Sequence, residues 1–296
     1  MALTEPVHLE PFARQTLSLP AEERIDYLRR PRWIGYSRAR QISDYLDEVL
    51  RHPKVHRMPN VLLIGESNNG KTMLAARFAE RHKSPADSSK IRVLMVQAPA
   101  APDENRFYAG ILEALHAPYR PPETAARRQI QVLHLLRSLG LEMLIIDEIH
   151  HILAGHYAKQ RYFLNVLKYL GNDLQIPLVG VGTLDALRAV NTEEQIATRF
   201  EPMAIPSWEW SQEFRMLLAS FERVLPLAEP SHLAAEALGK RLLAMSEGTI
   251  GALSSLLNRA GAVAIRKGRE RIDEQVLKET DWVRPSERRQ RAELLV

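Results

Sequence analysis

The sequence predicts an α/β fold in which a parallel sheet is covered by helices on both faces, followed by a small all-helical domain. Short apolar runs alternate with amphipathic helical patterns between residues 60 and 207. This alternation is typical of a parallel sheet whose strands are joined by helices. A glycine-containing loop joins the first apolar run to the helical pattern after it. Beyond Trp208 the strand pattern stops and only helical patterns follow.

The elements are expected in the following order. Prolines interrupt residues 1–20, and we expect an extended arm there. Two helical patterns follow within residues 20–53, separated by Pro31 and by a turn near Gly35. The expected strands are Asn60–Gly65, Arg92–Gln97, Leu141–Asp147, Ile176–Gly182 and Pro202–Ser207. The expected helices of the last part are Ser211–Leu225, Ser231–Met245, Ile250–Arg266 and Asp273–Asp281.

Composition limits the classes of protein that need to be considered. The 296 residues have room for a core and a small second domain, and their 45% hydrophobic content is ordinary for a globular protein. The absence of cysteine excludes disulfides and thiolate zinc sites and is compatible with a reducing, cytoplasmic location. No apolar stretch approaches the ~18–20 residues of a membrane span, and no signal-peptide pattern is present. A net charge of +4 gives mild support for an anionic partner.

The first strand runs into the pattern G-x-x-x-x-G-K-T, which is typical of a phosphate-binding loop. Backbone N–H groups of such a loop, and the helix after it, point at the phosphates of a nucleotide. Lys71 is expected to reach the β- and γ-phosphates, and Thr72 to bind Mg²⁺. A chance match is the alternative, and the flanking strand and helix argue against it. The expected nucleotide-binding residues are Gly65, Glu66, Ser67, Asn68, Asn69, Gly70, Lys71 and Thr72.

The carboxylate of Glu66 is unexpected in a loop that binds a polyanion. Because the main chain makes most phosphate contacts, side chains at the variable positions can point outward. We therefore expect Glu66 to face solvent or a neighbouring subunit. Asparagine tolerates left-handed backbone better than most residues, so Asn68 and Asn69 suit a tight loop.

A second motif, Asp147-Glu148, ends the apolar run "MLIID". One carboxylate at this position suits Mg²⁺, and the next suits a water molecule that attacks the γ-phosphate. Alone, the pair is common and also serves to cap helices. Its place downstream of a phosphate-binding loop favours the catalytic interpretation.

Two further residues have alternative interpretations. Thr183 ends the next strand, which we expect between the other two, so its hydroxyl either senses the γ-phosphate or caps the helix that follows. Arg199 precedes the last strand at the end of a helical pattern. It is either an arginine finger that reaches a nucleotide on an adjacent subunit or a solvated residue at a helix end.

Taken together, these motifs resemble those of AAA+ ATPases. More narrowly, "RWIGYSRA", "RMPNVLLIGESNNGKTML", "MLIIDEIHHI" and "ATRFEP" resemble TniB, a transposition ATPase related to TnsC and MuB. The resemblance runs from about Trp33 to Trp282. It implies an arm and helix (residues 1–30), an AAA+ core (31–209), a helical lid (210–284) and a charged tail (285–296).

The resemblance also implies roles for individual residues. Trp33, Ile34 and Tyr36 would hold the adenine. The catalytic residues would be Lys71, Glu148, Thr183 and Arg199, and the Mg²⁺ ligands Thr72 and Asp147. The lid carries Gly251 and Ala252 where many relatives have a basic residue. Either Arg259 substitutes for that residue or sensing by the lid is weak.

The partners that the resemblance implies are double-stranded DNA, a transposase, a TniQ-type targeting protein and further copies of the chain in a ring or helical filament. No membrane is involved. Loops expected to face the DNA supply phosphate-binding candidates, which are Arg106, Thr124, Arg127, Arg128, His156, Lys159 and Arg161. No residue suggests base reading, so binding should be independent of sequence and sensitive to salt. The alternative is that these are solvated surface residues.

Three histidines near the Asp-Glu motif, His150, His151 and His156, lack the spacing of a helical metal site. We interpret them as polar neighbours of the Mg²⁺ site or as surface residues. Two other functions share the core motifs: a replication initiator or helicase loader, and a DNA scaffold that binds ATP without hydrolysing it. The short segment after the lid disfavours the initiator, and Glu148 argues against the scaffold.

Overall fold

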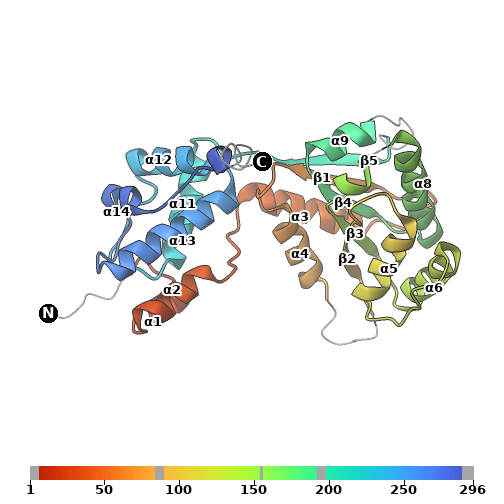
Figure 1. The fold of residues 1–296 in the computed structure, drawn as a ribbon, viewed down its shortest axis with the longest axis horizontal. Coiled ribbons are helices and arrows are strands. Elements are labelled where there is room, and N and C mark those ends of the chain that lie inside the picture. The colour runs from red at the N-terminus through yellow and green to blue at the C-terminus, as the bar shows by residue number, and fades with distance from the viewer. Residues whose placement is uncertain (1–6, 84–89, 154–155, 192–197, 289–296) are drawn as a thin grey trace. The chain divides into compact units, whose positions relative to one another are not determined.

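The computed structural model describes residues 7–83, 90–153, 156–191 and 198–288. These residues form two compact units. One unit covers residues 38–206, and the other combines the described parts of 1–37 and 207–296. In Figure 1 the first unit contains the sheet and the second contains only helices. This division differs from the expected boundaries at residues 30, 209 and 284, because the N-terminal segment packs with the C-terminal helices. The expected functional domains stay a proposal.

The sheet has five parallel strands in the order β2-β3-β4-β1-β5. Strand β4 lies between β1 and β3, as the sequence predicts. The strands are β1 Asn60–Gly65, β2 Val93–Gln97, β3 Met143–Asp147, β4 Leu178–Gly182 and β5 Phe200–Ile205. The expected α/β fold class, with helices on both faces and a helical region after the sheet, is confirmed.

The expected position of the last strand is wrong by two residues. Strand β5 begins at Phe200 and not at Pro202, and it ends at Ile205 and not at Ser207. It lies at the edge of the sheet and pairs only with β1, where Leu62 is the partner of Pro202. An edge strand tolerates a proline because one side of its backbone needs no hydrogen-bond partner in the sheet.

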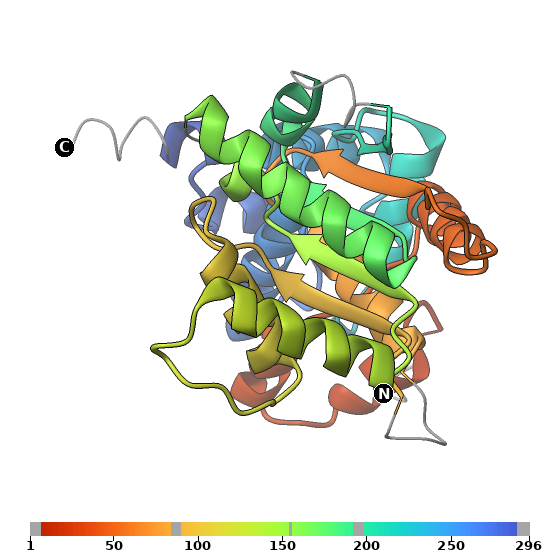
Figure 2. The ribbon, with the colours of Figure 1, turned by 90° about the vertical axis from the view of Figure 1, so that its right-hand side faces the viewer.

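Helices cover both faces of the sheet. One face packs α5, α6 and α8 over a core that includes Phe107, Leu136 and Phe163, and Figure 2 shows α6 and α8 in front of the strands. Helices α3 and α4 lie on the other side of the sheet in Figure 1, joined by contacts of Asp47 with Arg81 and His82. The helices of this unit are α3 Ser37–Leu50, α4 Lys71–Arg81, α5 Glu104–Ala114, α6 Ala125–Ser138, α7 His150–Leu153, α8 Tyr157–Leu174 and α9 Leu184–Asn191.

The helical unit contains six named helices from the two ends of the chain. These are α1 Pro11–Thr16, α2 Ala21–Arg29, α11 Gln212–Val224, α12 Glu236–Ser246, α13 Ile250–Arg266 and α14 Glu274–Glu279. The expected extended arm is therefore wrong for residues 11–16. Pro11 occupies the first turn of α1, where proline is tolerated because that N–H has no partner in the helix.

Helix α2 belongs to the helical unit because it packs on α13. Leu28 of α2 fills the space beside Gly261, where an added Cβ would lie 3.0 Å from the leucine side chain. The guanidinium of Arg24, which is buried, donates to the Glu270 carboxylate and to the Pro226 carbonyl. These contacts join parts of the chain more than 200 residues apart, so the helical pattern alone does not predict them.

One helix of this unit starts later than expected. The pattern from Ser231 predicts a helix, but α12 begins at Glu236. The N–H groups of His232 and Leu233 donate to the Glu222 carboxylate, and the Ser231 hydroxyl accepts from Ile272. These bonds hold the segment outside the helix. Among the described residues, no helix has the length and apolar character needed to cross a membrane.

Candidate nucleotide-binding site

The loop after β1 has the geometry of a phosphate-binding loop. Asn68 and Gly70 have left-handed backbone, with φ angles of 62° and 82°, and α4 begins directly after them. Asn68 therefore adopts the left-handed backbone that asparagine is expected to tolerate in this loop. The side chain of Glu66 is exposed, as the outward orientation predicts. Gly65 approaches the adjacent strand so closely that an added Cβ would lie 2.7 Å from the Ile205 carbonyl oxygen.

Asn69 departs from the outward orientation expected of the variable positions. Its side chain is fully buried, and Nδ2 donates to the carbonyl oxygens of Ile205 at 3.1 Å and Pro206 at 2.9 Å. The loop is therefore fastened to the end of β5 by a side chain. Spacing rules treat this position as variable, so the sequence motif carries no signal for the contact.

Lys71 is the first residue of α4, and its side chain reaches back to the loop. Its ammonium donates to the carbonyl oxygens of Gly65 at 2.9 Å and Glu66 at 2.7 Å. Burial lowers the pKa of Lys71, while the charges of Glu148, Asp147 and Glu66 oppose that shift. An ammonium has three N–H donors, so these two bonds position it and leave a third for a phosphate oxygen.

Asp147 and Thr72 meet at the carboxyl end of β3. Burial raises the pKa of Asp147, and hydrogen bonds from the Thr72 side chain and the Glu148 N–H oppose the rise. A carboxylate and a hydroxyl side by side, next to a phosphate-binding loop, provide the hard oxygen ligands that Mg²⁺ prefers. The residues present therefore fit the expected Mg²⁺ site.

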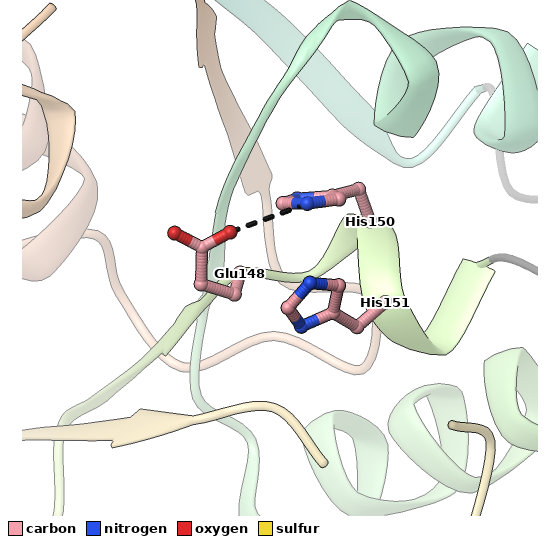
Figure 3. A group of neighbouring side chains, drawn as sticks. All are labelled: Glu148, His150 and His151. Carbon is pink, nitrogen blue, oxygen red and sulfur yellow. Dashed lines mark ion pairs between the residues drawn. The ribbon is translucent and has the colours of Figure 1, made fainter. Parts of the chain in front are cut away.

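Glu148 follows directly and has left-handed backbone, with φ of 55°. Its Oε2 lies 3.3 Å from Nε2 of His150, and the rings of His150 and His151 are 4.4 Å apart (Figure 3). One possible ligand atom from each of these three residues lies within 4.8 Å of the others. The two histidines are thus neighbours of Glu148, whereas exposed His156 is not part of the group.

Thr183 stands at the end of β4, between the phosphate-binding strand and the Asp-Glu strand. Its hydroxyl is buried and has no hydrogen-bond partner among the described residues. The capping alternative requires a bond from this hydroxyl to the helix that follows, and no such bond is made within the described part of the chain. A buried hydroxyl without a partner, at the end of the strand between β1 and β3, favours the sensor interpretation.

Arg199 lies at the amino-terminal ends of the strands, whereas the phosphate-binding loop of the same chain lies at their carboxyl ends. It precedes Phe200, which pairs with Asn60 at the start of β1, whereas the loop follows Gly65 at the other end. Six strand residues separate the two, a distance of about 20 Å. Arg199 therefore cannot serve its own site. The helical pattern expected before it falls on residues 192–197, outside the described residues.

The guanidinium of Arg199 is held in place by its neighbours. It donates to Asn172 Oδ1 at 3.2 Å, and burial and the nearby charge of Arg57 lower its pKa. Arg57 itself donates to the carbonyl and the hydroxyl of Thr198, both at 3.0 Å. Asn172 belongs to no quoted motif, and the segment that begins at Arg57 assigns that residue no role, so only the fold places the two beside Arg199.

The expected adenine contacts and the lid arginine lie in the helical unit. Ile34 and Tyr36 are buried there, and Tyr36 contacts Trp208 edge to face at 5.1 Å. Their role toward adenine, and that of Trp33, stays a prediction. Arg259 donates to the Asp281 carbonyl and lies over the Trp282 ring, so its described contacts are structural.

The sequence matches the family described as "Bacterial TniB protein" over residues 24–210, which is more than half of the chain. The chain belongs to the TniB family. No curated protein matches the sequence.

Several solved structures resemble that of this TniB-family protein. The Aeropyrum pernix ORC2 protein, in its ADPNP-ADP complexes, has a TM-score of 0.63 and 17% identity, with 86% of this chain and 71% of that chain covered. The Aeropyrum pernix ORC1 protein in complex with DNA has a TM-score of 0.59 and 20% identity, with 90% and 68% covered. Cdc6p from Pyrobaculum aerophilum has a TM-score of 0.62 and 18% identity, with 86% and 71% covered.

At identities this low, the similarity to these structures shows a shared fold and nothing more. The TniB family, this fold and the arranged phosphate-binding and Asp-Glu residues together identify an ATPase of the AAA+ type.

Contacts join the starts of α5 and α6 and link α5 to the second turn of α8, near the residues expected to contact DNA. Asn105 of α5 accepts from Arg128 of α6, and Tyr162 of α8 donates to Glu104 of α5. Phe107 and Phe163 join α5 and α8 further by a ring contact of 5.2 Å. The positive ends of the α5 and α6 dipoles therefore lie near one another, which favours a negatively charged ligand.

Most of the expected DNA-contacting residues are exposed around these helix starts. Thr124 caps α6 by accepting from the Arg127 N–H, and His156 occupies the N-cap position of α8. Arg106 makes an exposed ion pair with Asp103. The members that are exposed at the surface are Arg106, Thr124, Arg127, His156, Lys159 and Arg161.

Arg128 is the exception and corrects the expected set. It is only 5% exposed, and its guanidinium donates to Asn105 and to the carbonyls of Arg120 and Pro121. The guanidinium also lies over the Tyr119 ring at 4.8 Å. Arg128 therefore joins the starts of α5 and α6 and does not reach a ligand.

Proposed function

We propose that this protein is an ATP-dependent regulator of DNA transposition that oligomerises on duplex DNA without reading its sequence. It recruits a transposase and a TniQ-type targeting protein, and ATP hydrolysis controls its disassembly. The observation that carries the proposal is the TniB-family match, which spans a chain with a complete phosphate-binding loop and Asp-Glu pair. The partner proteins follow from the family resemblance alone.

The ATP cycle rests on a few side chains. Lys71 binds the β- and γ-phosphates with the N–H that its two loop bonds leave over. Thr72 and Asp147 would hold Mg²⁺, which when bound neutralises phosphate charge. Glu148 takes a proton from the attacking water, and the Thr183 hydroxyl donates a hydrogen bond to a γ-phosphate oxygen or bonds to the attacking water.

Assembly completes the site. Arg199 lies about 20 Å from the phosphate-binding loop of its own chain, so its target is a nucleotide held by a neighbouring subunit. A cation supplied in this way stabilises charge that develops on the transferred phosphoryl group. Hydrolysis then requires a homo-oligomer, either a ring or a helical filament.

DNA binding uses the exposed cations at the starts of α5, α6 and α8. Lys and Arg side chains neutralise phosphates, and helix N-termini add backbone donors. Such interactions give no base discrimination, and each phosphate neutralised releases counterions, so affinity falls steeply with salt.

The test is charge reversal at Arg106 and Lys159, two exposed cations of this surface. Arg106→Glu with Lys159→Glu should weaken ATP-dependent DNA binding equally for unrelated duplexes. The slope of log affinity against log salt should fall by roughly 0.9 for each phosphate that the variant no longer neutralises. Binding is measured by fluorescence anisotropy over a range of salt concentrations.

The matched control reverses the charges of Arg51 and Lys54. Both are exposed in the same unit, but they precede β1 and so lie near the amino-terminal ends of the strands. It changes the net charge by the same amount and should leave the slope unchanged. Equal losses of affinity in both double variants would mean that only net charge matters, which would overturn the proposed surface.

A further inference from the structure

The backbone of Glu148 is held in an unfavourable conformation from both sides. Its N–H donates to Asp147 Oδ1 at 2.9 Å, and the N–H of the next residue, Ile149, donates to Val181 on β4 at 2.9 Å. The left-handed conformation between them is unfavourable for a residue with a Cβ. Such strain persists where the surroundings determine it, and it often occurs at functional sites.

The side chain of Glu148 meets a single described partner at its carboxylate. Nε2 of His150 lies 3.3 Å from Oε2 (Figure 3). Burial lowers the pKa of His150, although the Glu148 charge opposes the shift, and this favours the neutral ring with one N–H. A neutral ring that faces a carboxylate places its N–H on the facing nitrogen.

The other nitrogen of the ring supports this arrangement. Nδ1 of His150 is buried and has no hydrogen-bond partner among the described residues. A buried nitrogen acceptor without a donor costs less free energy than a buried N–H without an acceptor. This difference again favours the tautomer that carries its hydrogen on Nε2.

The position of His150 is determined by strand β4. An added Cβ at Gly182 would lie 3.2 Å from the Ile149 side chain and 3.4 Å from the backbone nitrogen of His150. One at Gly180 would lie 2.7 Å from the Ile149 side chain. The absence of side chains at both glycines lets the turn after Glu148 lie directly on β4. The backbone of His150 is therefore fixed beside Gly182, the last residue of β4.

We propose that His150 is a positioning residue that orients the Glu148 carboxylate for proton abstraction. A free glutamate side chain samples several rotamers, and restricting it before the reaction removes an entropic cost from the chemical step. With Oε2 facing Nε2 of His150 at 3.3 Å, Oε1 remains for the attacking water. This inference rests on the proposed role of Glu148 as the general base.

The experiment compares His150→Phe with His151→Phe. Both keep an aromatic ring in the His150–His151 contact, and only the first removes the nitrogen that faces Glu148. For DNA-stimulated ATP hydrolysis we expect kcat to fall about tenfold in His150→Phe, because the polar contact proposed to orient the carboxylate is removed. The KM for ATP should stay within about twofold, and His151→Phe should resemble wild type.

A second pair protects the test against misfolding of the phenylalanine variant. Glutamine and methionine have similar shapes, but only glutamine has an N–H to donate. His150→Gln should retain most of the wild-type kcat, and His150→Met should lose it. In a Glu148→Gln background, His150→Phe should cause no further loss of kcat, because the carboxylate that it orients is absent.

The outcomes separate this inference from the proposed function. Wild-type hydrolysis by Glu148→Gln would contradict the general-base role itself. If Glu148→Gln is slow while His150→Phe or His150→Met keeps the wild-type kcat, only the role of His150 is overturned. Equal losses of kcat in His150→Phe and His151→Phe, or an additive loss in the Glu148→Gln background, would also overturn it.

Discussion

The Asn69 amide shows how a single side chain supports a loop that otherwise works through its main chain. Its two bonds to Ile205 and Pro206 tie the phosphate-binding loop to β5. Asn69→Asp replaces the donating amide with an acceptor that faces two carbonyl oxygens, so buried groups are left without hydrogen bonds. We expect the affinity for ATP to weaken at least tenfold and the melting temperature to fall.

Asn68→Asp is the matched control for that variant. Asn68 is the exposed neighbour in the same loop, and aspartate tolerates its left-handed backbone about as well. The same change of charge should therefore have little effect on melting temperature. Calorimetric ATP binding and thermal unfolding measure both variants, and similar effects in the two would show that charge and not the buried bonds is responsible.

At the scale of elements, the packing of α2 on the C-terminal helices depends on Arg24 and Glu270. Burial raises the pKa of Glu270, but bonds from the Arg24 guanidinium and the Ala228 N–H outweigh this, so its pKa is lowered overall. A carboxylate with a lowered pKa in the folded state stabilises the fold above its unfolded pKa. That stability is lost as the pH falls through the folded value.

Glu270→Gln should therefore lower the free energy of unfolding by about 2 kcal/mol at pH 7. It should also flatten the dependence on pH below about 4.5, the ordinary glutamate value. Urea unfolding between pH 3.5 and 7 measures both effects. Glu22→Gln breaks an exposed pair between α2 and Arg266 of α13, close to the same contact, and should change stability much less. A larger effect of Glu22→Gln would contradict the account.

The sequence predicts elements well where a local pattern determines them. The phosphate-binding loop, the Asp-Glu strand and the alternation of strands and helices follow from spacing and apolar runs. The start of α12 does not, because the Glu222 carboxylate, ten residues before His232, binds the N–H groups that a helix would use. The buried roles of Asn69, Arg128 and His150 likewise depend on neighbours that only the fold supplies.

At the scale of the whole molecule, the proposal that Arg199 serves a neighbouring subunit makes each chain half of a catalytic site. Arg199→Ala should bind ATP normally and lose hydrolysis, whereas Lys71→Ala should lose ATP binding itself. When the two variants are mixed, assemblies containing both should recover part of the ATPase activity, because some interfaces combine an intact loop with an intact arginine. Activity is measured against the mixing ratio.

The mixing curve has a clear contradicting result. If Arg199→Ala alone hydrolyses ATP at the wild-type rate, its role across the interface is wrong. If Arg199→Ala is inactive and no mixture recovers activity, Arg199 supports folding or assembly and not catalysis in a neighbouring subunit.

The central claim is that ATP hydrolysis ends the complex with DNA, and Glu148→Gln tests it most directly. Glutamine keeps the shape of the side chain but cannot take a proton from water, so hydrolysis should slow by about 10²–10⁴-fold. The contacts of Lys71, Thr72 and Asp147 with nucleotide do not depend on this carboxylate, so the ATP-bound complex should still form. The measurement is dissociation from a DNA duplex after free ATP is removed. The account predicts that Glu148→Gln leaves the DNA much more slowly than wild type, and equal dissociation rates would contradict it.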